Sequence, residues 1–84
     1  MGLMKKAIII GATSGMGRGI ALGLLAEGYA IGVCGRRKEA LDEIKAMSPD
    51  RVFTKVIDVT KDEAPSLLME LISEMGGMDL YFHS

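Results

Sequence analysis

The chain has 84 residues, 49% of them hydrophobic and 25% charged, and its formal net charge is -1. This composition excludes a disordered chain and is typical of one folded domain over residues 1–84, which at this size buries only about 60% of the surface of its unfolded chain. A net charge so close to zero argues against nucleic acid as a partner, and no apolar run approaches the roughly 18 residues of a membrane span. The single cysteine, Cys34, can form no internal disulfide, which suits a reducing compartment and predicts a cytoplasmic protein.

Hydrophobic patterning predicts strands and helices that alternate along the chain. Short apolar runs rich in β-branched residues predict buried strands, and apolar residues at helical spacing predict helices. In chain order, the predicted elements are a strand over residues 7–10, a helix over 15–27, a strand over 30–34, a helix over 39–47, a strand over 52–59, a helix from 60 to 75 and a strand over 78–82.

Glycine, proline and a capping motif mark the ends of these helices. Gly28 is placed to end the first helix in the left-handed conformation, and Gly76 to end the third. Thr60 and Glu63 have the spacing of a capping box, which predicts that the third helix starts at Thr60, with Pro65 in its first turn or so.

The alternation of strands and helices predicts an α/β fold with a parallel sheet, because parallel strands need a crossover between them. We expect a Rossmann-like sheet with the strand order 3-2-1-4, the first two helices on one face and the third on the other. No sequence after the fourth strand is available to cover its edge. We therefore expect a truncated doubly wound fold, with residues 1–84 forming the N-terminal part of a longer domain.

Residues 11–17, Gly-Ala-Thr-Ser-Gly-Met-Gly, follow the first strand and open the first helix. Free backbone N–H groups and the positive end of the helix dipole converge there, so we expect a bound anion. Gly11 can take a tight turn, Gly15 lets the backbone approach a pyrophosphate, and Gly17 lets the helix pack closely on the strand. No Gly-Lys-Ser/Thr sequence follows, which excludes a P-loop. The alternative is that the glycines serve only a tight strand-to-helix connection.

Thr13, Ser14 and Met16 lie inside the same turn. The two hydroxyls could bind a phosphate or a ribose, or could bond their own backbone, as Ser and Thr in turns often do. We also expect Met16 to be a cofactor-binding residue, because it lies within the predicted phosphate turn.

Arg36 and Arg37 follow the second strand. In dinucleotide-binding folds an Asp or Glu about 20 residues after the glycine turn binds the ribose 2′-hydroxyl, whereas an arginine there accommodates a 2′-phosphate. This chain has no carboxylate between Glu27 and Glu39. We therefore predict NADP(H) rather than NAD(H), with Arg36 holding the phosphate and Arg37 supporting it. Both arginines could instead be a solvated start of the second helix, although that end of a helix dipole disfavours cations.

Three motifs at the ends of successive strands carry a family resemblance. They are residues 11–17, Cys-Gly-Arg-Arg at 34–37, and Asp-Val-Thr at 58–60. Together they resemble the cofactor half of the short-chain dehydrogenase/reductase family, over essentially the whole chain. The resemblance implies that Asp58 accepts a hydrogen bond from the adenine amino group, with Val59 beside the ring. Asp58 could also be part of the cap of the third helix.

The same resemblance implies catalytic residues that this chain lacks. The family has an Asn-Asn-Ala-Gly segment after the fourth strand, then a catalytic serine and a Tyr-x-x-x-Lys motif. Here His83 and Ser84 stand where the two asparagines are expected, and His83 could help to position the ribose or the nicotinamide. Neither tyrosine fits the motif, because Val33 lies four residues after Tyr29 and only three residues follow Tyr81.

These observations predict the NADP(H)-binding cofactor half of a short-chain oxidoreductase, which transfers hydride between the nicotinamide and a small carbonyl or alcohol substrate. The catalytic residues would lie beyond Ser84. One alternative is a relative that binds the nucleotide without catalysis. Another is a self-associating module, because an uncovered apolar strand edge invites pairing, and we expect a homo-oligomer.

Overall fold

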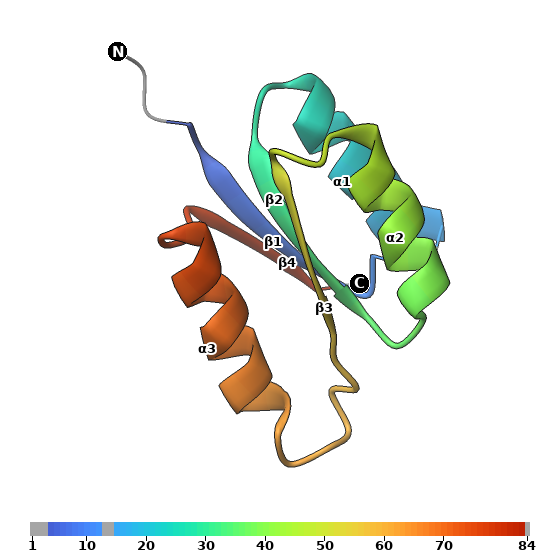
Figure 1. Cartoon of the computed structure of the whole chain (residues 1–84), viewed down its shortest axis with the longest axis vertical. Coiled ribbons are helices and arrows are strands. Elements are labelled where there is room, and N and C mark those ends of the chain that lie inside the picture. Colours follow the sequence, from blue (N-terminus) through green and yellow to red (C-terminus); the bar gives the residue numbers. More distant parts are fainter. Residues whose placement is uncertain (1–3, 13–14, 84) are drawn as a thin grey trace.

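The computed structural model describes residues 4–12 and 15–83. Strands and helices alternate in the predicted order (Figure 1). They are β1 (Lys6–Ile10), α1 (Gly15–Ala26), β2 (Ala30–Gly35), α2 (Lys38–Met47), β3 (Val52–Val56), α3 (Ala64–Met75) and β4 (Leu80–His83). No helix in the described part of the chain is long and apolar enough to cross a membrane.

The four strands form one parallel sheet in the order β3-β2-β1-β4. Ile9 in β1 is paired with Val33 in β2 on one side and with Phe82 in β4 on the other. Figure 1 shows α1 and α2 together on one face of the sheet and α3 on the opposite face. The predicted Rossmann-like α/β fold, its strand order and the division of its helices are confirmed.

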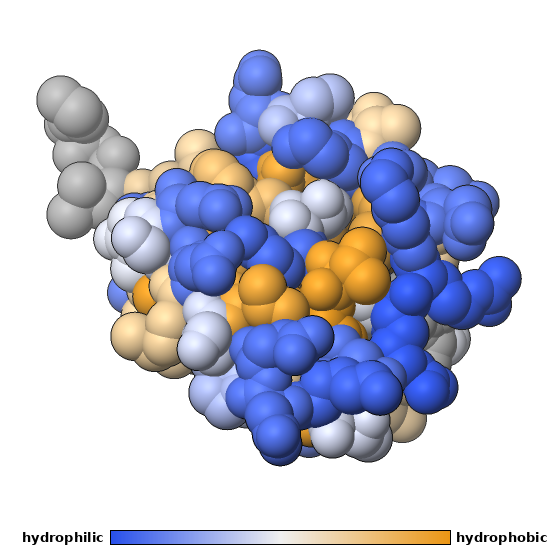
Figure 2. Space-filling model, turned by 60° about the horizontal axis from the view of Figure 1, so that its bottom comes forward, coloured by the Kyte–Doolittle hydropathy of each residue, from blue (hydrophilic) through white to orange (hydrophobic). Residues whose placement is uncertain are grey.

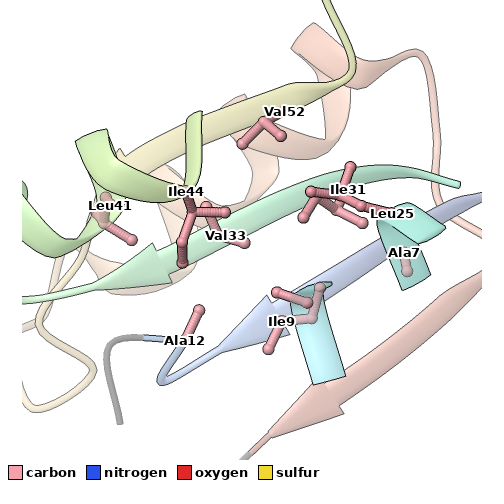
Figure 3. Close-up of a cluster of buried hydrophobic side chains, with 10 residues drawn as sticks. Ala7, Ile9, Ala12, Leu25, Ile31, Val33, Leu41, Ile44 and Val52 are labelled. Atoms are coloured by element: carbon pink, nitrogen blue, oxygen red, sulfur yellow. The ribbon is translucent and has the colours of Figure 1, made fainter. Parts of the chain in front are cut away.

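Alternate side chains of β1 enter two different hydrophobic cores. Ala7 and Ile9 point toward α1 and α2, where they pack with residues such as Leu41 and Ile44 (Figure 3). Ile8 and Ile10 point the other way and pack beneath α3. A strand buried on both faces needs a continuous apolar sequence, which explains the Ala-Ile-Ile-Ile run of β1.

Positive-φ glycines end two of the helices, as predicted. Gly28, with φ of 94°, follows α1, and Gly76, with φ of 81°, is the left-handed C-cap of α3. Arg51 satisfies carbonyl groups near the end of α1, because its guanidinium donates to the Leu25 oxygen at 3.1 Å and to the Tyr29 oxygen at 3.0 Å. Each helix end therefore has partners for carbonyl groups that the helix itself leaves unpaired.

The segment between β3 and α3 differs from the prediction. β3 ends at Val56 rather than at residue 59, and α3 begins at Ala64, with Glu63 as an N-cap that makes no side-chain bond. The predicted capping box is therefore wrong. The hydroxyl of Thr60 donates to Asp58 instead, which holds the chain in a turn, and short polar side chains often compete with regular structure in this way.

At Gly32 in β2, side chains of α3 pack directly against the backbone of the sheet. A Cβ atom at this position would overlap the sulfur of Met75 and lie 2.8 Å from Ile8 Cδ1 and 3.2 Å from Leu71 Cδ2. All three neighbours are buried, so none can move aside into solvent. Glycine is required here by packing and not by backbone conformation.

We expect Gly32→Ala to lower the free energy of unfolding by about 1–3 kcal/mol, because overpacking displaces side chains in a closed core. Gly23→Ala, on the exposed side of α1 with nothing within 4 Å of the added Cβ, is the matched control and should raise that free energy by up to about 1 kcal/mol. Urea denaturation followed by circular dichroism measures both. Equal stability of the two variants would contradict the packing argument.

Candidate functional site

The loops that follow the strands meet at one edge of the sheet, because parallel strands all finish on the same side. This carboxyl edge holds nine of the predicted site residues. They are Gly11, Gly15, Met16, Gly17, Arg36, Arg37, Asp58, Val59 and His83. The other two, Thr13 and Ser14, lie outside the described residues.

The glycine-rich turn is attached to the end of β2. Gly11 has a φ of 86°, and the N–H groups of Gly11 and Ala12 both donate to the Cys34 carbonyl oxygen, at 2.9 and 3.1 Å. Gly17 is buried in line with Ala21 and Leu25 on the inner side of α1. The tight turn predicted for Gly11 is therefore observed, and Gly17 lies on the buried side of α1, where the predicted close packing requires it.

Gly15 differs from these two glycines because nothing in the described structure explains it. It is exposed, its φ is not positive, and a Cβ added to it would meet no atom within 4 Å. Met16 beside it is 75% exposed. The first turn of α1 carries no acidic side chain, so no carboxylate of that turn offsets the positive end of the helix dipole. This end of α1 is open and electrically suited to an anion.

Two exposed arginines follow β2 at the same edge. Arg37 is the N-cap residue of α2 and makes no side-chain cap bond, and Arg36 precedes it. The N–H of Ile57 donates to the Gly35 carbonyl oxygen at 2.9 Å, which joins the end of β2 to the segment after β3. The arginines and Asp58 are therefore held on neighbouring segments.

Asp58 accepts two hydrogen bonds on one of its oxygens. Its Oδ1 accepts from the Thr60 hydroxyl at 2.6 Å and from the Thr60 backbone N–H at 3.0 Å. These two bonds, followed by the positive charges of Arg36 and Lys61, hold the pKa of Asp58 below its ordinary value. Asp58 is therefore a carboxylate at neutral pH and can only accept hydrogen bonds.

Thr60 is a residue whose position in the site was not predicted. Its spacing from Glu63 favoured a helix cap, but the Asp-x-Thr spacing of residues 58–60 also fits an Asx turn, in which an Asp side chain bonds the backbone two residues on. That signal was present in the sequence and competed with the capping box.

A hollow of about 270 Å³ opens beside these residues. It is lined by Ile10, Ile57, Val59, Ala64, Pro65, Leu68, Tyr81 and His83. Figure 2, which turns the strand ends toward the viewer, shows a hydrophobic area bordered by hydrophilic residues. Val59 lies in the loop after β3 and His83 at the end of β4, and both line this one hollow.

Cys34 lies next to the glycine-rich turn but is not available for chemistry. Its side chain is fully buried, and burial raises the pKa of the thiol to about 12 despite the opposing charge of Lys55. A neutral buried thiol is a poor nucleophile, so Cys34 acts as a small core residue.

Comparison with known proteins shows the family to which the chain belongs. Residues 5–83 match the family model of the short chain dehydrogenases. The chain is 34% identical to the 3-oxoacyl-(acyl-carrier-protein) reductase of Staphylococcus aureus over 85 residues, which is 95% of this chain and 35% of that protein. The chain therefore belongs to the short-chain dehydrogenase family, whose members are oxidoreductases that use nicotinamide cofactors.

Solved structures agree with this assignment. An alcohol dehydrogenase from Thermococcus sibiricus, in complex with 5-hydroxy-NADP, has a TM-score of 0.86 at 30% identity over 94% of this chain and 36% of that one. A 3-ketoacyl-(acyl-carrier-protein) reductase from Brucella melitensis, in complex with NADH, has a TM-score of 0.83 at 24% identity over 92% of this chain and 32% of that one, and supports the fold alone. The chain thus spans about a third of the length of these relatives.

Proposed function

We propose that this chain binds NADP(H) as the cofactor half of a short-chain oxidoreductase. The whole protein would transfer hydride between the nicotinamide and a carbonyl or alcohol substrate, with its catalytic residues beyond Ser84. The names of the relatives, an acyl-carrier-protein reductase and an alcohol dehydrogenase, support this substrate class. We further propose that residues 1–84 act as a single cofactor-binding domain in the cytoplasm.

One observation carries the proposal: the N-terminal end of α1, whose first turn has no acidic side chain, and the exposed Arg36 and Arg37 lie at the same edge of the sheet. NADP(H) has two separate anionic groups, a pyrophosphate and a 2′-phosphate. A helix end matches the first, since its N–H groups and dipole favour phosphate. A guanidinium matches the second, since it can hold phosphate in a bidentate manner. NADH has only the pyrophosphate and would leave the arginines unused.

The residues of this chain would each contribute to binding and orientation. Gly15 lets the pyrophosphate approach α1, and Thr13, Ser14 and Met16, its neighbours in the sequence, are proposed to belong to the same phosphate-binding turn. Arg36 holds the 2′-phosphate with support from Arg37. The bound cofactor would supply the hydride, so the task of the chain is to hold it in one orientation.

The other end of the proposed site would receive the adenine and the adjoining ribose. Asp58 accepts a hydrogen bond from the adenine amino group, and Val59, which is 51% exposed, covers one side of the ring. His83, at the end of β4, would position the ribose or the nicotinamide. The hollow that Val59 and His83 share supplies the apolar surface that a flat base requires.

Arg36→Asp should weaken NADPH binding by about 10- to 100-fold, because a charge-assisted bond to the 2′-phosphate is replaced by repulsion. NADH, which lacks that phosphate, should lose little affinity. Isothermal titration calorimetry with both nucleotides measures the difference. Lys38→Asp, which makes the same charge change at an exposed position two residues on, is the control. If wild-type protein bound NADH as tightly as NADPH, the cofactor preference would be wrong.

Gly15→Ala should lower NADPH affinity by about 10-fold or more, because the added Cβ occupies the space into which the pyrophosphate fits. Its free energy of unfolding should not fall, since the Cβ meets no atom of the protein. Gly23→Ala, further along α1, should bind NADPH like the wild type. Loss of stability in Gly15→Ala would mean that packing explains the glycine.

Self-association is a second candidate function, and the exposed edge of β4 favours it. β4 lies at one end of the strand order, contains no Asp, Glu, Lys or Arg, and exposes Leu80 and Tyr81. The opposite edge strand, β3, carries Lys55, which forms salt bridges with Glu70 and Glu74 of α3. Charged residues discourage edge pairing, so a second copy would pair with β4 rather than with β3.

If a chain of 84 residues pairs through β4, light scattering after size exclusion should give about twice the 9.0 kDa mass of one chain. Tyr81→Lys should shift the protein to the monomer, because a charge on the pairing strand opposes a like charge on its copy. Val56→Lys, at an exposed position on the other edge strand, should leave the mass unchanged. A wild-type protein of 9.0 kDa at every concentration would overturn this function.

A further inference from the structure

We propose that Thr60 is a positioning residue for base recognition: it holds one oxygen of Asp58 so that the other oxygen is kept for the amino group of adenine. The proposal rests on the proposed function, since it concerns how the same site would read its nucleotide. It adds a reason for the side chain at position 60, which the predicted helix cap does not explain.

The two carboxylate oxygens of Asp58 differ in their hydrogen-bond partners. Both donors of Thr60, the hydroxyl at 2.6 Å and the backbone N–H at 3.0 Å, bond the same atom, Oδ1. No donor of the described residues bonds the other oxygen, Oδ2. A carboxylate with a single partner can rotate, but two donors from a residue two positions on restrict its orientation. Asp58 therefore keeps one acceptor atom uncommitted on a side chain with limited freedom.

The surroundings of Asp58 favour a ligand over another side chain of the protein. Ile57, just before it, is buried and joined through its N–H to the Gly35 carbonyl oxygen at 2.9 Å, so the backbone at this point is attached to β2. Val59, just after it, is half exposed and lines the apolar hollow. A carboxylate beside an apolar surface suits a flat group that carries an N–H donor at its rim, as adenine does.

The alternative explanation is that Thr60 only shapes the turn before α3. Backbone bonds already define that turn: the N–H of Lys61 donates to the backbone carbonyl oxygen of Asp58 at 3.0 Å, and the N–H of Ala64 donates to that of Lys61 at 3.2 Å. Valine at position 60 would keep the backbone N–H and nearly the same shape, and would remove only the hydroxyl. Serine would keep the hydroxyl. This pair of variants therefore separates orientation of Asp58 from formation of the turn.

The test compares NADPH with the analogue that has hypoxanthine in place of adenine and so presents a carbonyl oxygen where adenine presents an amino group. By calorimetry, Thr60→Val should weaken NADPH binding by about 3- to 10-fold, which is the range for one hydrogen bond, and Thr60→Ser should restore wild-type affinity. Wild-type protein should bind the hypoxanthine analogue more weakly than NADPH, and Thr60→Val should bind that analogue no more weakly than the wild type does.

A second readout is the titration of the Asp58 carboxyl carbon by NMR in the same variants without nucleotide. Thr60→Val should raise the pKa of Asp58, since it removes the first of the groups that lower it, while the charges of Arg36 and Lys61 remain. Thr60→Ser should leave the titration unchanged. Urea denaturation of each variant checks that the fold is retained.

The outcomes distinguish failure of this inference from failure of the proposed function. Wild-type protein that binds no NADPH would overturn the proposed function, and this inference with it. Wild-type protein that binds NADPH and the hypoxanthine analogue equally would show that the amino group is not read. That outcome would overturn this inference and the adenine contact proposed for Asp58, but not the proposal that the chain binds NADP(H). An equal loss of affinity for both nucleotides in Thr60→Val would assign Thr60 to the turn.

Discussion

β1 has hydrogen-bonded neighbours on both sides and helices over both faces, so Ala7, Ile8 and Ile9 are entirely removed from solvent. Alternate residues of this one strand contribute to both hydrophobic cores. Packing is equally close at β2, where the side chains of α3 leave room only for glycine at position 32. At its carboxyl end, the buried strand β1 turns directly into the glycine-rich segment.

The chemical character of the carboxyl edge follows from this arrangement. Parallel strands bring all their following loops to one side, together with the N-terminal ends of α1 and α2. Helix N-termini are positive, and the chain adds Arg36 and Arg37 to them. Asp58, on the neighbouring segment, adds a carboxylate that accepts two hydrogen bonds from Thr60. Anionic and amino-bearing parts of one ligand could thus be bound by different loops.

Much of the fold could be predicted because each strand is a short apolar run and each helix has a clear apolar periodicity. The parallel sheet followed from the alternation of elements, and its order β3-β2-β1-β4 followed from the Rossmann-like fold that the alternation and the family resemblance implied. The roles of Gly11 and Gly17 followed from their place between a strand and a helix. The segment after β3 could not be predicted in the same way. In the sequence, the side chain of Thr60 could bond either Asp58 or the start of the third helix. It bonds Asp58, and that outcome depends on backbone geometry, which the spacing of apolar residues does not reveal.

Hydrogen bonds join different elements at both edges of the sheet. At the amino edge, long side chains reach across elements: Lys6 bonds the Gly76 oxygen, Lys45 bonds the Val52 oxygen, and Arg51 bonds the Leu25 and Tyr29 oxygens. At the carboxyl edge, backbone N–H groups join the segments: those of Gly11 and Ala12 donate to the Cys34 oxygen, and that of Ile57 donates to the Gly35 oxygen. Because these bonds need no particular side chain, exposed residues such as Arg36 and Arg37 can be replaced at the carboxyl edge without breaking them.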